Sequence, residues 1–481
     1  MSATPLLAEQ FHHDPRIAQA KRLLHEALAE HQGKFTAPRA ADPHRAATYA
    51  DTIARFGDIR GGALYFPYLA SGLGRGALVE LADGSIKYDM ISGIGVHHLG
   101  HSNPRLVEAL VDAALRDTVM QGNLQQGTQA LEFSQELLAA ANRESSAAIP
   151  AKLEDSHGRA SRLRHCFLTT SGAMANENAL KMILQKRSPA ARLLAFEHCF
   201  MGRTLALSQI TDKAQYRAGL PQVLSVDYVP FFDPVRPQES IDAATATLRQ
   251  HLARYPGQHA AMGFELVQGE GGYWPGRRDF FVALMTILRE QGVAIFVDEV
   301  QTFGRTHELF AFQHFDLDEY VDVVTLGKLT QVCATLFTDE YVPRAALISQ
   351  TFTGATSSLL AAQVILGTLR SGGYFGADGR NAQVHRRFVQ HFEAIGQRRP
   401  GCLSGPYGLG GMIALTPGDG SAETAKRVVH ELFHAGVIAF VAGGAGGQPA
   451  RVRFLPPVPA LSDADIDAVC DILEKVLQQE E

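Results

Sequence analysis

The stretch "VAIFVDEVQTFGRT", residues 293–306, joins an apolar run to a polar turn. The run is rich in β-branched and aromatic residues, which is typical of a strand buried inside a sheet. Asp298 and Glu299 follow the run, and Gln301 comes two residues later. Because ligands of an open parallel sheet bind outside the carboxyl ends of its strands, an acid here is placed to meet a ligand. The alternative is that Asp298 caps a helix, since Asp is a preferred N-cap residue.

Similar apolar runs lie on both sides of this stretch and alternate with helical patterns. Strands that are apolar on both faces and alternate with helices predict an α/β fold, in which helices cover both faces of a parallel sheet. The predicted strands are 166–170, 192–197, 223–229, 260–267, 293–300 and 321–327, and predicted helices include 104–117, 240–254 and 277–291.

The two ends of the chain have a different pattern. Residues 1–60 are polar and helical, and "ALVELADGSIKYDMISGI" (77–94) predicts two short strands about an Asp83-Gly84 turn. After about residue 365, helices and short strands lead to an amphipathic helix at 462–478, which indicates a separate C-terminal lobe. The polar segment 142–164 is typical of an exposed insertion or mobile loop.

Composition excludes several classes of protein. With 481 residues, a net charge of −6 and a pI of about 6.3, the chain gives no electrostatic reason to expect nucleic acid or an anionic membrane as a partner. The five cysteines are scattered and form no C-x-x-C pair, which predicts a reduced, cytoplasmic protein without structural disulfides or a thiolate metal site. The N-terminus lacks a secretory signal pattern, and no apolar run reaches the roughly 18 residues of a membrane-spanning helix.

Two further turns carry candidate chemistry. In "TTSGAMANENALKM" (169–182), Ser171 and Gly172 lead from a strand into a helix, where free N–H groups suit a phosphate; a simple N-cap is the alternative. In "TLGKLTQ" (325–331), Lys328 directly follows an apolar strand. A lysine amine in an apolar crevice has a lowered pKa, as a Schiff-base nucleophile requires. The alternative is a lysine that extends to solvent.

These turns belong to a series of motifs that resembles the class III aminotransferases of the pyridoxal-phosphate fold type I. The resemblance runs from about residue 70 to the end. It implies a large domain with a mainly parallel sheet at 76–350, and a smaller α+β domain built from 1–75 and 351–481. The matching motifs are "TSGAMANENALK", "FMGRT", "ELVQGEGG", "FVDEVQTFGRT", "VTLGK", "TFTGA" and "RVRFLPP".

The resemblance implies that the cofactor is pyridoxal 5′-phosphate. Lys328 matches the lysine that forms an aldimine with it, and Asp298 matches the acid that faces the pyridine nitrogen. Gln301 matches the residue that reaches the ring hydroxyl, while Glu299 is expected to serve structure. The other implied cofactor contacts are the phosphate turn Ser171, Gly172 and Ala173, the stacking Phe200, and Thr351, which reaches the phosphate of the partner subunit in a homodimer or higher oligomer.

The resemblance also implies which residues contact the substrate. Arg453 matches the arginine that holds a substrate carboxylate, and Arg203 matches a position that contacts the distal carboxylate in some members. Glu270 matches the glutamate that pairs with the first arginine, so that one pocket accepts two dissimilar substrates. The alternative for both arginines is a surface or structural ion pair.

The expected reaction is ping-pong transfer of a terminal amino group from an amino acid or amine to a keto acid such as 2-oxoglutarate or pyruvate. The run Gly327 to Cys333 looks more like lysine 6-aminotransferases than like acetylornithine or ornithine enzymes. There are two alternatives. One is another class III reaction, such as that of an aminomutase or a decarboxylating transaminase, and the other is a non-catalytic role. Departures such as Met174, Met201 and Leu266 leave the substrate open.

Two other features of the sequence are better explained by a structural role than by a binding site. His97 and His101 have the spacing of metal ligands on one helical turn, but "LGHSNP" matches a family turn, so no metal is expected. The glycine-rich "GGAGGQ" (443–448) lacks the strand and lysine of a phosphate loop, which favours a flexible loop.

Overall fold

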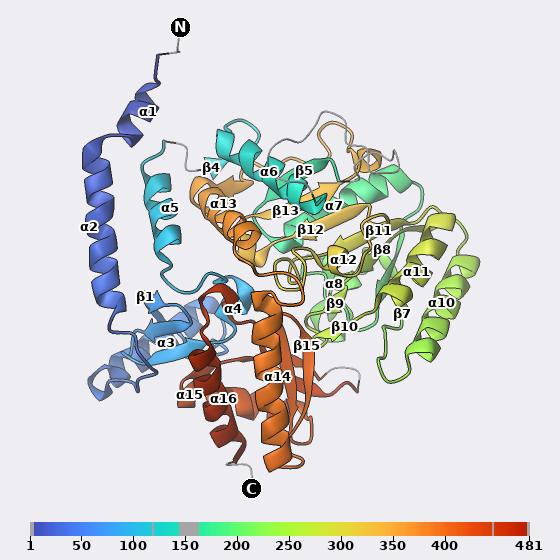
Figure 1. Cartoon of the computed structure of the whole chain (residues 1–481). Helices are drawn as coiled ribbons and strands as arrows, with labels where there is room; N and C mark the ends of the chain where they lie inside the picture. The colour runs from blue at the N-terminus through green and yellow to red at the C-terminus, as the bar shows by residue number, and fades with distance from the viewer. Residues whose placement is uncertain (1–3, 118–119, 144–162, 445–446, 479–481) are drawn as a thin grey trace.

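A seven-stranded sheet forms the centre of the larger part of the molecule (Figure 1). The computed structural model describes residues 4–117, 120–143, 163–444 and 447–478. The strand order is β5-β13-β12-β11-β8-β6-β7. The strands are β5 (His165–Thr169), β6 (Arg192–Phe196), β7 (Ser225–Val229), β8 (His259–Phe264), β11 (Ala294–Asp298), β12 (Val323–Leu326) and β13 (Cys333–Phe337).

Most neighbours in this sheet are parallel, as the sequence predicted. The pairs formed by β7, β6, β8, β11 and β12 run parallel, and each predicted strand is found within a few residues of its expected bounds. The exception is β13, which the sequence analysis missed and which pairs antiparallel with both β12 and β5. Its five residues are all buried, and so short an apolar run has no periodicity that distinguishes a strand from other buried segments.

Helices cover this sheet and shield its apolar strands. Helix α7 (Gly172–Arg187) packs against β5, β12 and β13, while α10 (Pro237–Arg254) and α11 (Arg278–Glu290) pack against β7 and β11. Helix α13 (Thr356–Ser371) lies against α5 (Pro104–Ala114) and α6 (Thr128–Ala141), and its buried leucines join the same hydrophobic core. The carboxyl ends of the parallel strands are thereby left at one edge of the sheet.

A second core lies in the smaller lobe, which combines both ends of the chain (Figure 1). The predicted hairpin is confirmed: β2 (Leu78–Leu81) and β3 (Ile86–Asp89) pair antiparallel, and Gly84 takes the positive φ that the turn requires. The parallel pairing of β3 with β17 (Val437–Ile438) links the N-terminal and C-terminal segments. The lobe also contains β1 (Ala70–Arg75), the sheet β15 (Leu403–Leu409), β16 (Met412–Pro417), β19 (Ala450–Phe454) and β18 (Phe440–Gly443), and helices α14 (Arg380–Arg398), α15 (Ala422–Ala435) and α16 (Asp463–Gln478).

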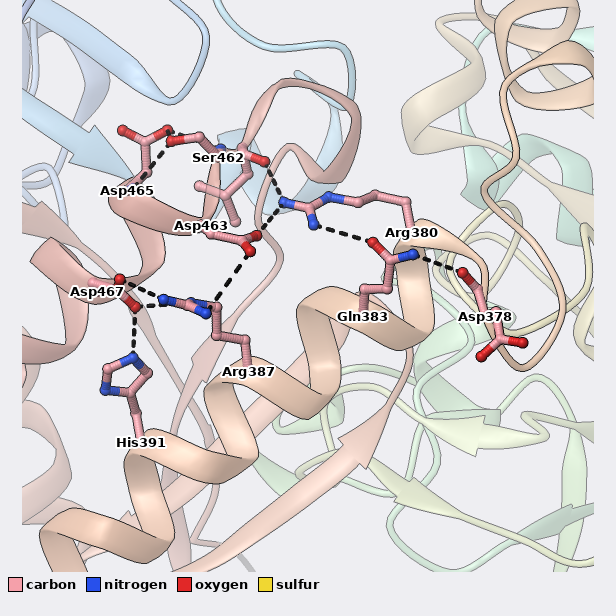
Figure 2. Close-up of polar contacts among 10 residues, drawn as sticks. Asp378, Arg380, Gln383, Arg387, His391, Ser462, Asp463, Asp465 and Asp467 are labelled. Carbon is pink, nitrogen blue, oxygen red and sulfur yellow. Dashed lines mark hydrogen bonds and ion pairs between the residues drawn. The ribbon is translucent and has the colours of Figure 1, made fainter.

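Figure 2 shows the charged contacts that hold α14 against the start of α16. Arg387 and His391, one helical turn apart on α14, both reach Asp467 on α16, with donor–acceptor distances of 2.5–2.8 Å. Arg380 donates to the carbonyl of Leu461 at 2.7 Å and pairs with Asp463 at 3.0 Å. We call this group of residues the α14–α16 clasp.

The N-terminal helices α1 (Leu7–His12), α2 (Pro15–Gln32) and α3 (Ala46–Arg60) extend along one side of the molecule (Figure 1). Within the described part of the chain, no helix is both long and apolar enough to cross a bilayer. Most of the predicted insertion at 142–164 lies outside the described residues.

Candidate active site

A cavity of about 340 Å³ opens at the carboxyl edge of the large sheet. The sequence-predicted residues Gly172, Ala173, Phe200, Arg203, Glu270, Asp298, Gln301 and Lys328 all line it, although they come from five different segments of the chain. The other lining residues are Asn176, Met201, Gly202, Glu265, Val267, Val300 and Thr302. The register of the parallel strands, all of which end at this edge, is what brings these residues together.

Asp298 ends β11 and is held by two hydrogen bonds. Its Oδ2 accepts from Asn176 Nδ2 at 2.7 Å, and its Oδ1 accepts from the backbone N–H of Val300 at 2.8 Å. Asn176 is fixed in turn by Thr325, whose hydroxyl donates to Asn176 Oδ1 at 2.6 Å. Burial raises the pKa of Asp298, although the two hydrogen bonds and Lys328 oppose that shift. A cation beside Asp298 would favour the charged form of the carboxylate and would itself be stabilised by that charge.

Lys328 begins the turn after β12 in a left-handed conformation, with φ of 54°. This region is costly for a residue with a side chain, so strain is concentrated at the reactive position. Desolvation by the surrounding protein lowers the pKa of Lys328 to about 8, while Asp298 acts in the opposite direction. The amine is thus available in its neutral, nucleophilic form near neutral pH, as the sequence analysis expected.

The phosphate turn and the predicted stacking residue lie next to each other. Ser171 is the N-cap of α7, because its hydroxyl accepts from the N–H of Met174 at 3.2 Å. Glycine at 172 lets the chain pass close to Val300, since a Cβ there would lie 2.7 Å from the Val300 side chain. Phe200 is held through its backbone N–H, which donates to Glu265 Oε2 at 2.7 Å.

Glu265, at the end of β8, joins two walls of the cavity. Its other oxygen accepts from the N–H of Gly269 at 3.1 Å, so one carboxylate fixes both the Phe200 segment and the turn that carries Glu270. Burial raises the pKa of Glu265 to about 8. By contrast, Glu299 accepts from backbone N–H groups of Ala311 and Phe312, which agrees with the structural role expected for it.

Arg453 and Glu270 form a buried ion pair. Arg453 Nη2 donates to Glu270 Oε1 at 2.5 Å, and the arginine side chain is fully buried. Burial disfavours the charge of Arg453, but Glu270 and Tyr273 outweigh it, so the pKa of Arg453 is raised. The pKa of Glu270 is about 2, because Arg453 and Lys213 outweigh its desolvation. The pair is therefore fully charged at neutral pH.

Comparison with known proteins decides the family. The family model described as Aminotransferase class-III matches residues 67–477. The chain belongs to the class III aminotransferases. This aminotransferase is 29% identical over 418 residues to acetylornithine aminotransferase from Listeria monocytogenes serotype 4b, covering 85% of this chain and 94% of the relative. It is 29% identical over 412 residues to LysW-aminoadipate semialdehyde transaminase from Deinococcus radiodurans, covering 84% and 85%.

Solved structures share the fold of this aminotransferase. Lysine aminotransferase from M. tuberculosis superimposes with a TM-score of 0.75 at 24% identity, covering 89% of this chain and 99% of the other. The predicted fold type I and the predicted dependence on pyridoxal phosphate are confirmed, and the non-catalytic alternative is set aside.

The residues present fit pyridoxal phosphate. Gln301 is buried and its Oε1 has no hydrogen-bond partner, so the cavity holds an acceptor that a ring hydroxyl can satisfy. Asp298 offers a negative charge to a protonated ring nitrogen, and the α7 N-terminus at Gly172 offers N–H groups to a phosphate. Lys328 offers an amine of lowered pKa to the aldehyde. Each functional group of the cofactor thus has a complementary group on this edge of the sheet.

Two predicted residues of the aminotransferase lie farther out. Arg203 is exposed at the rim of the cavity, where it donates to the Tyr216 hydroxyl at 2.9 Å. Thr351 is exposed and is not among the cavity residues; its backbone lies against Gly122. Its expected contact with a partner subunit stays a prediction.

Sequence reasoning missed several residues that support the site. Asn176 lies within a quoted motif, but only the fold reveals that it holds Asp298. Arg451 is fully buried between the rings of Trp274 and Tyr407, at 3.7 and 3.4 Å from their centroids, and donates to the carbonyl of Gly272. It therefore ties β19 to the turn that carries Glu270. Its position two residues before Arg453, on the same face of a strand, was the available signal.

The histidine pair takes a structural arrangement. The rings of His97 and His101 stack with centroids 4.5 Å apart, and His101 Nε2 lies 2.9 Å from Asp89 Oδ2. In the part of the chain that the structure describes, no group of three or more His, Cys, Asp or Glu side chains is arranged to hold a metal ion.

Proposed function

We propose that this aminotransferase transfers a terminal amino group from an amino acid or amine to a keto acid, with Lys328 as its catalytic base and covalent anchor for the cofactor. Lys328 and Asp298 face one cavity, and the buried Arg453–Glu270 pair lies beside it, which supports the proposal. The names of the relatives, acetylornithine and LysW-aminoadipate semialdehyde aminotransferases, point to substrates whose reacting group is at a chain end.

In this proposal, the residues at the cavity divide the work of holding the cofactor and moving protons. Pyridoxal phosphate, when bound, supplies an aldehyde and an electron-accepting ring. Asp298 keeps the proton on the ring nitrogen, Gln301 accepts from the ring hydroxyl, and Phe200 packs on the ring. Ser171, Gly172 and Ala173 hold the phosphate at the start of α7. Lys328 moves a proton at the substrate carbon that bears the amino group, for which a pKa of about 8 suits a base near neutral pH.

Substrate selection depends on the arginines. Arg453 binds the carboxylate of a keto acid such as 2-oxoglutarate or pyruvate once Glu270 releases it, because a guanidinium pairs with a carboxylate through two hydrogen bonds. Arg203 reaches a distal carboxylate from the rim of the cavity. A donor without a carboxylate at this end leaves the Arg453–Glu270 pair intact.

The test compares the two half-reactions in Arg453→Ala. Loss of the guanidinium leaves a substrate carboxylate unpaired, which typically costs about 2–3 kcal/mol, or roughly 30- to 150-fold in the half-saturation concentration of the keto acid. The half-reaction with a diamine donor should change much less. Single-turnover absorbance of the cofactor measures both, and equal impairment of the two would assign Arg453 a structural role.

We also propose a homodimer or higher oligomer in which Thr351 completes the partner's phosphate site. The domain division at 1–75, 76–350 and 351–481 is part of the same proposal. The cytoplasm is the proposed compartment, since all five cysteines are free.

A further inference from the structure

Lys213 contacts the same carboxylate that pairs with Arg453. Its Nζ lies 3.5 Å from Glu270 Oε2, whereas Arg453 binds the other oxygen, Oε1, at 2.5 Å. The side chains of Lys213 and Glu270 are only 11% and 19% exposed. Glu270 thus lies between two cations, and the contact with Lys213 uses an oxygen that Arg453 leaves free.

The two cations belong to different parts of the fold. Arg453 lies on β19 in the small lobe, and Lys213 precedes the short helix α9 (Ala214–Arg217), beside the large sheet. Among the described residues, Glu270 is the only acid that forms an ion pair with Lys213. The nearest ring is that of Tyr216, 5.6 Å from Nζ, whose hydroxyl accepts from Arg203. No other carboxylate in the described structure competes for the lysine.

The exchange at Arg453 requires Glu270 to find another partner. When a substrate carboxylate takes the guanidinium, a largely buried glutamate loses its strongest ion pair. A buried charge left unpaired is strongly destabilising, and that cost would be subtracted from the affinity for the substrate. A second cation already at 3.5 Å reduces the cost, because Glu270 keeps an ion-pair partner when Arg453 binds the substrate.

We propose that Lys213 is a positioning residue that receives Glu270 when a substrate carboxylate binds Arg453, and that it thereby selects for carboxylate-bearing substrates. The proposal rests on the proposed role of Arg453 and Glu270. It implies that Lys213 acts through Glu270 and does not contact the substrate. Substrates without a carboxylate at this end leave Glu270 on Arg453 and gain nothing from the lysine.

The first experiment measures ligand affinity apart from turnover. Glutarate, an unreactive dicarboxylate, is titrated into the pyridoxal-phosphate-loaded enzyme by calorimetry. Lys213→Met should weaken glutarate binding about tenfold, and Lys213→Arg should restore most of it, because the cation and not the lysine shape is required. Lys186→Met, at an exposed position on α7, is the matched control for loss of one lysine charge and should bind glutarate as the wild type does. Wild-type affinity in Lys213→Met overturns the proposal.

A double-mutant cycle with Glu270→Ala decides how Lys213 acts. In Glu270→Ala, Lys213 has no glutamate carboxylate to receive. Adding Lys213→Met to this variant should therefore change glutarate affinity by less than about twofold. A tenfold loss in that background as well would mean that Lys213 contacts the ligand directly, which overturns the proposal. The half-saturation concentrations for 2-oxoglutarate in the same four proteins should follow the same cycle.

Failure of the proposed role of Arg453 and failure of the proposed role of Lys213 give different results. If Arg453 does not bind the substrate carboxylate, Arg453→Ala retains wild-type glutarate affinity. If only the role of Lys213 is wrong, Arg453→Ala loses glutarate while Lys213 and Glu270 show no coupling. Circular dichroism and the amount of cofactor bound per chain establish that each variant is folded and loaded.

Discussion

At the scale of single residues, the surroundings of Lys328 set the protonation of its amine. Desolvation lowers its pKa from 10.5 to about 8, so the neutral form is favoured above pH 8 and the ammonium below it. Only the neutral amine attacks an aldehyde. We therefore expect the rate at which the cofactor-free protein takes up pyridoxal phosphate to rise with pH to a midpoint near 8 and then level off. Stopped-flow absorbance measures this rate, and a midpoint near 10 would contradict the assignment.

Asn176 gives a second prediction at this scale, because it holds the carboxylate of Asp298 in place. Asn176→Ala should lower kcat by about 10- to 100-fold, since a displaced supporting hydrogen bond typically costs about that factor at a site. Asn178, equally buried on α7 but without a partner for its Nδ2, provides the matched control. Similar losses in Asn178→Ala would show that damage to the helix, and not the bond to Asp298, lowers kcat.

How far sequence predicts the site depends on whether a contact lies within one turn or between distant segments. Lys328 and Asp298 were identified from their place at strand ends, where the register of a parallel sheet fixes their position. The contacts of Lys213 and Arg451 could not be, because their partners Glu270 and Gly272 lie 57 and 179 residues away in the chain. Contacts of that kind arise only once distant segments of the chain have folded together.

At the scale of elements, the same distinction applies to strands. The parallel strands were predicted because each is an apolar run set between helices. The antiparallel strand β13 was not, since only the three-residue 3₁₀ helix Lys328–Thr330 separates it from β12. β13 lies between β12 and β5, so the strand that sequence patterns missed is the one that joins β5 to the rest of the sheet.

The α14–α16 clasp gives the prediction for elements. Arg387 holds the pKa of Asp467 below its ordinary value, so the bond stabilises the fold at neutral pH and is lost as pH falls into the acid range below about 4. Asp467→Asn should lower Tm by about 2 °C at pH 7, a small shift because partly exposed ion pairs contribute little. The difference from wild type should shrink as pH falls. Thermal unfolding followed by circular dichroism tests this, and a Tm difference that stays constant with pH would exclude the ion pair as its cause.

At the scale of the whole molecule, exposed apolar side chains lie on the segments next to Thr351. Leu124 is 98% exposed, and Met120 and Phe352 are 38% and 42% exposed. The segments that carry these residues lie side by side, because β14 (Gly354–Ala355) pairs with β4 (Met120–Gln121). Thr351 lies next to Phe352 in the chain, so we expect the proposed partner subunit to pack against these exposed apolar side chains.

If a second copy covers this surface, each active site is built from two chains. Leu124→Glu should then weaken the dimer by placing a charge in an apolar interface, and cofactor and activity should be lost in step with dissociation on dilution. Thr351→Ala should weaken cofactor retention by removing a hydroxyl from the phosphate site, yet leave the dimer intact, because threonine contributes little apolar area. Sedimentation velocity and cofactor absorbance on the same samples separate the two effects. A fully active monomer would remove the shared site, since all the groups needed would then lie on one chain.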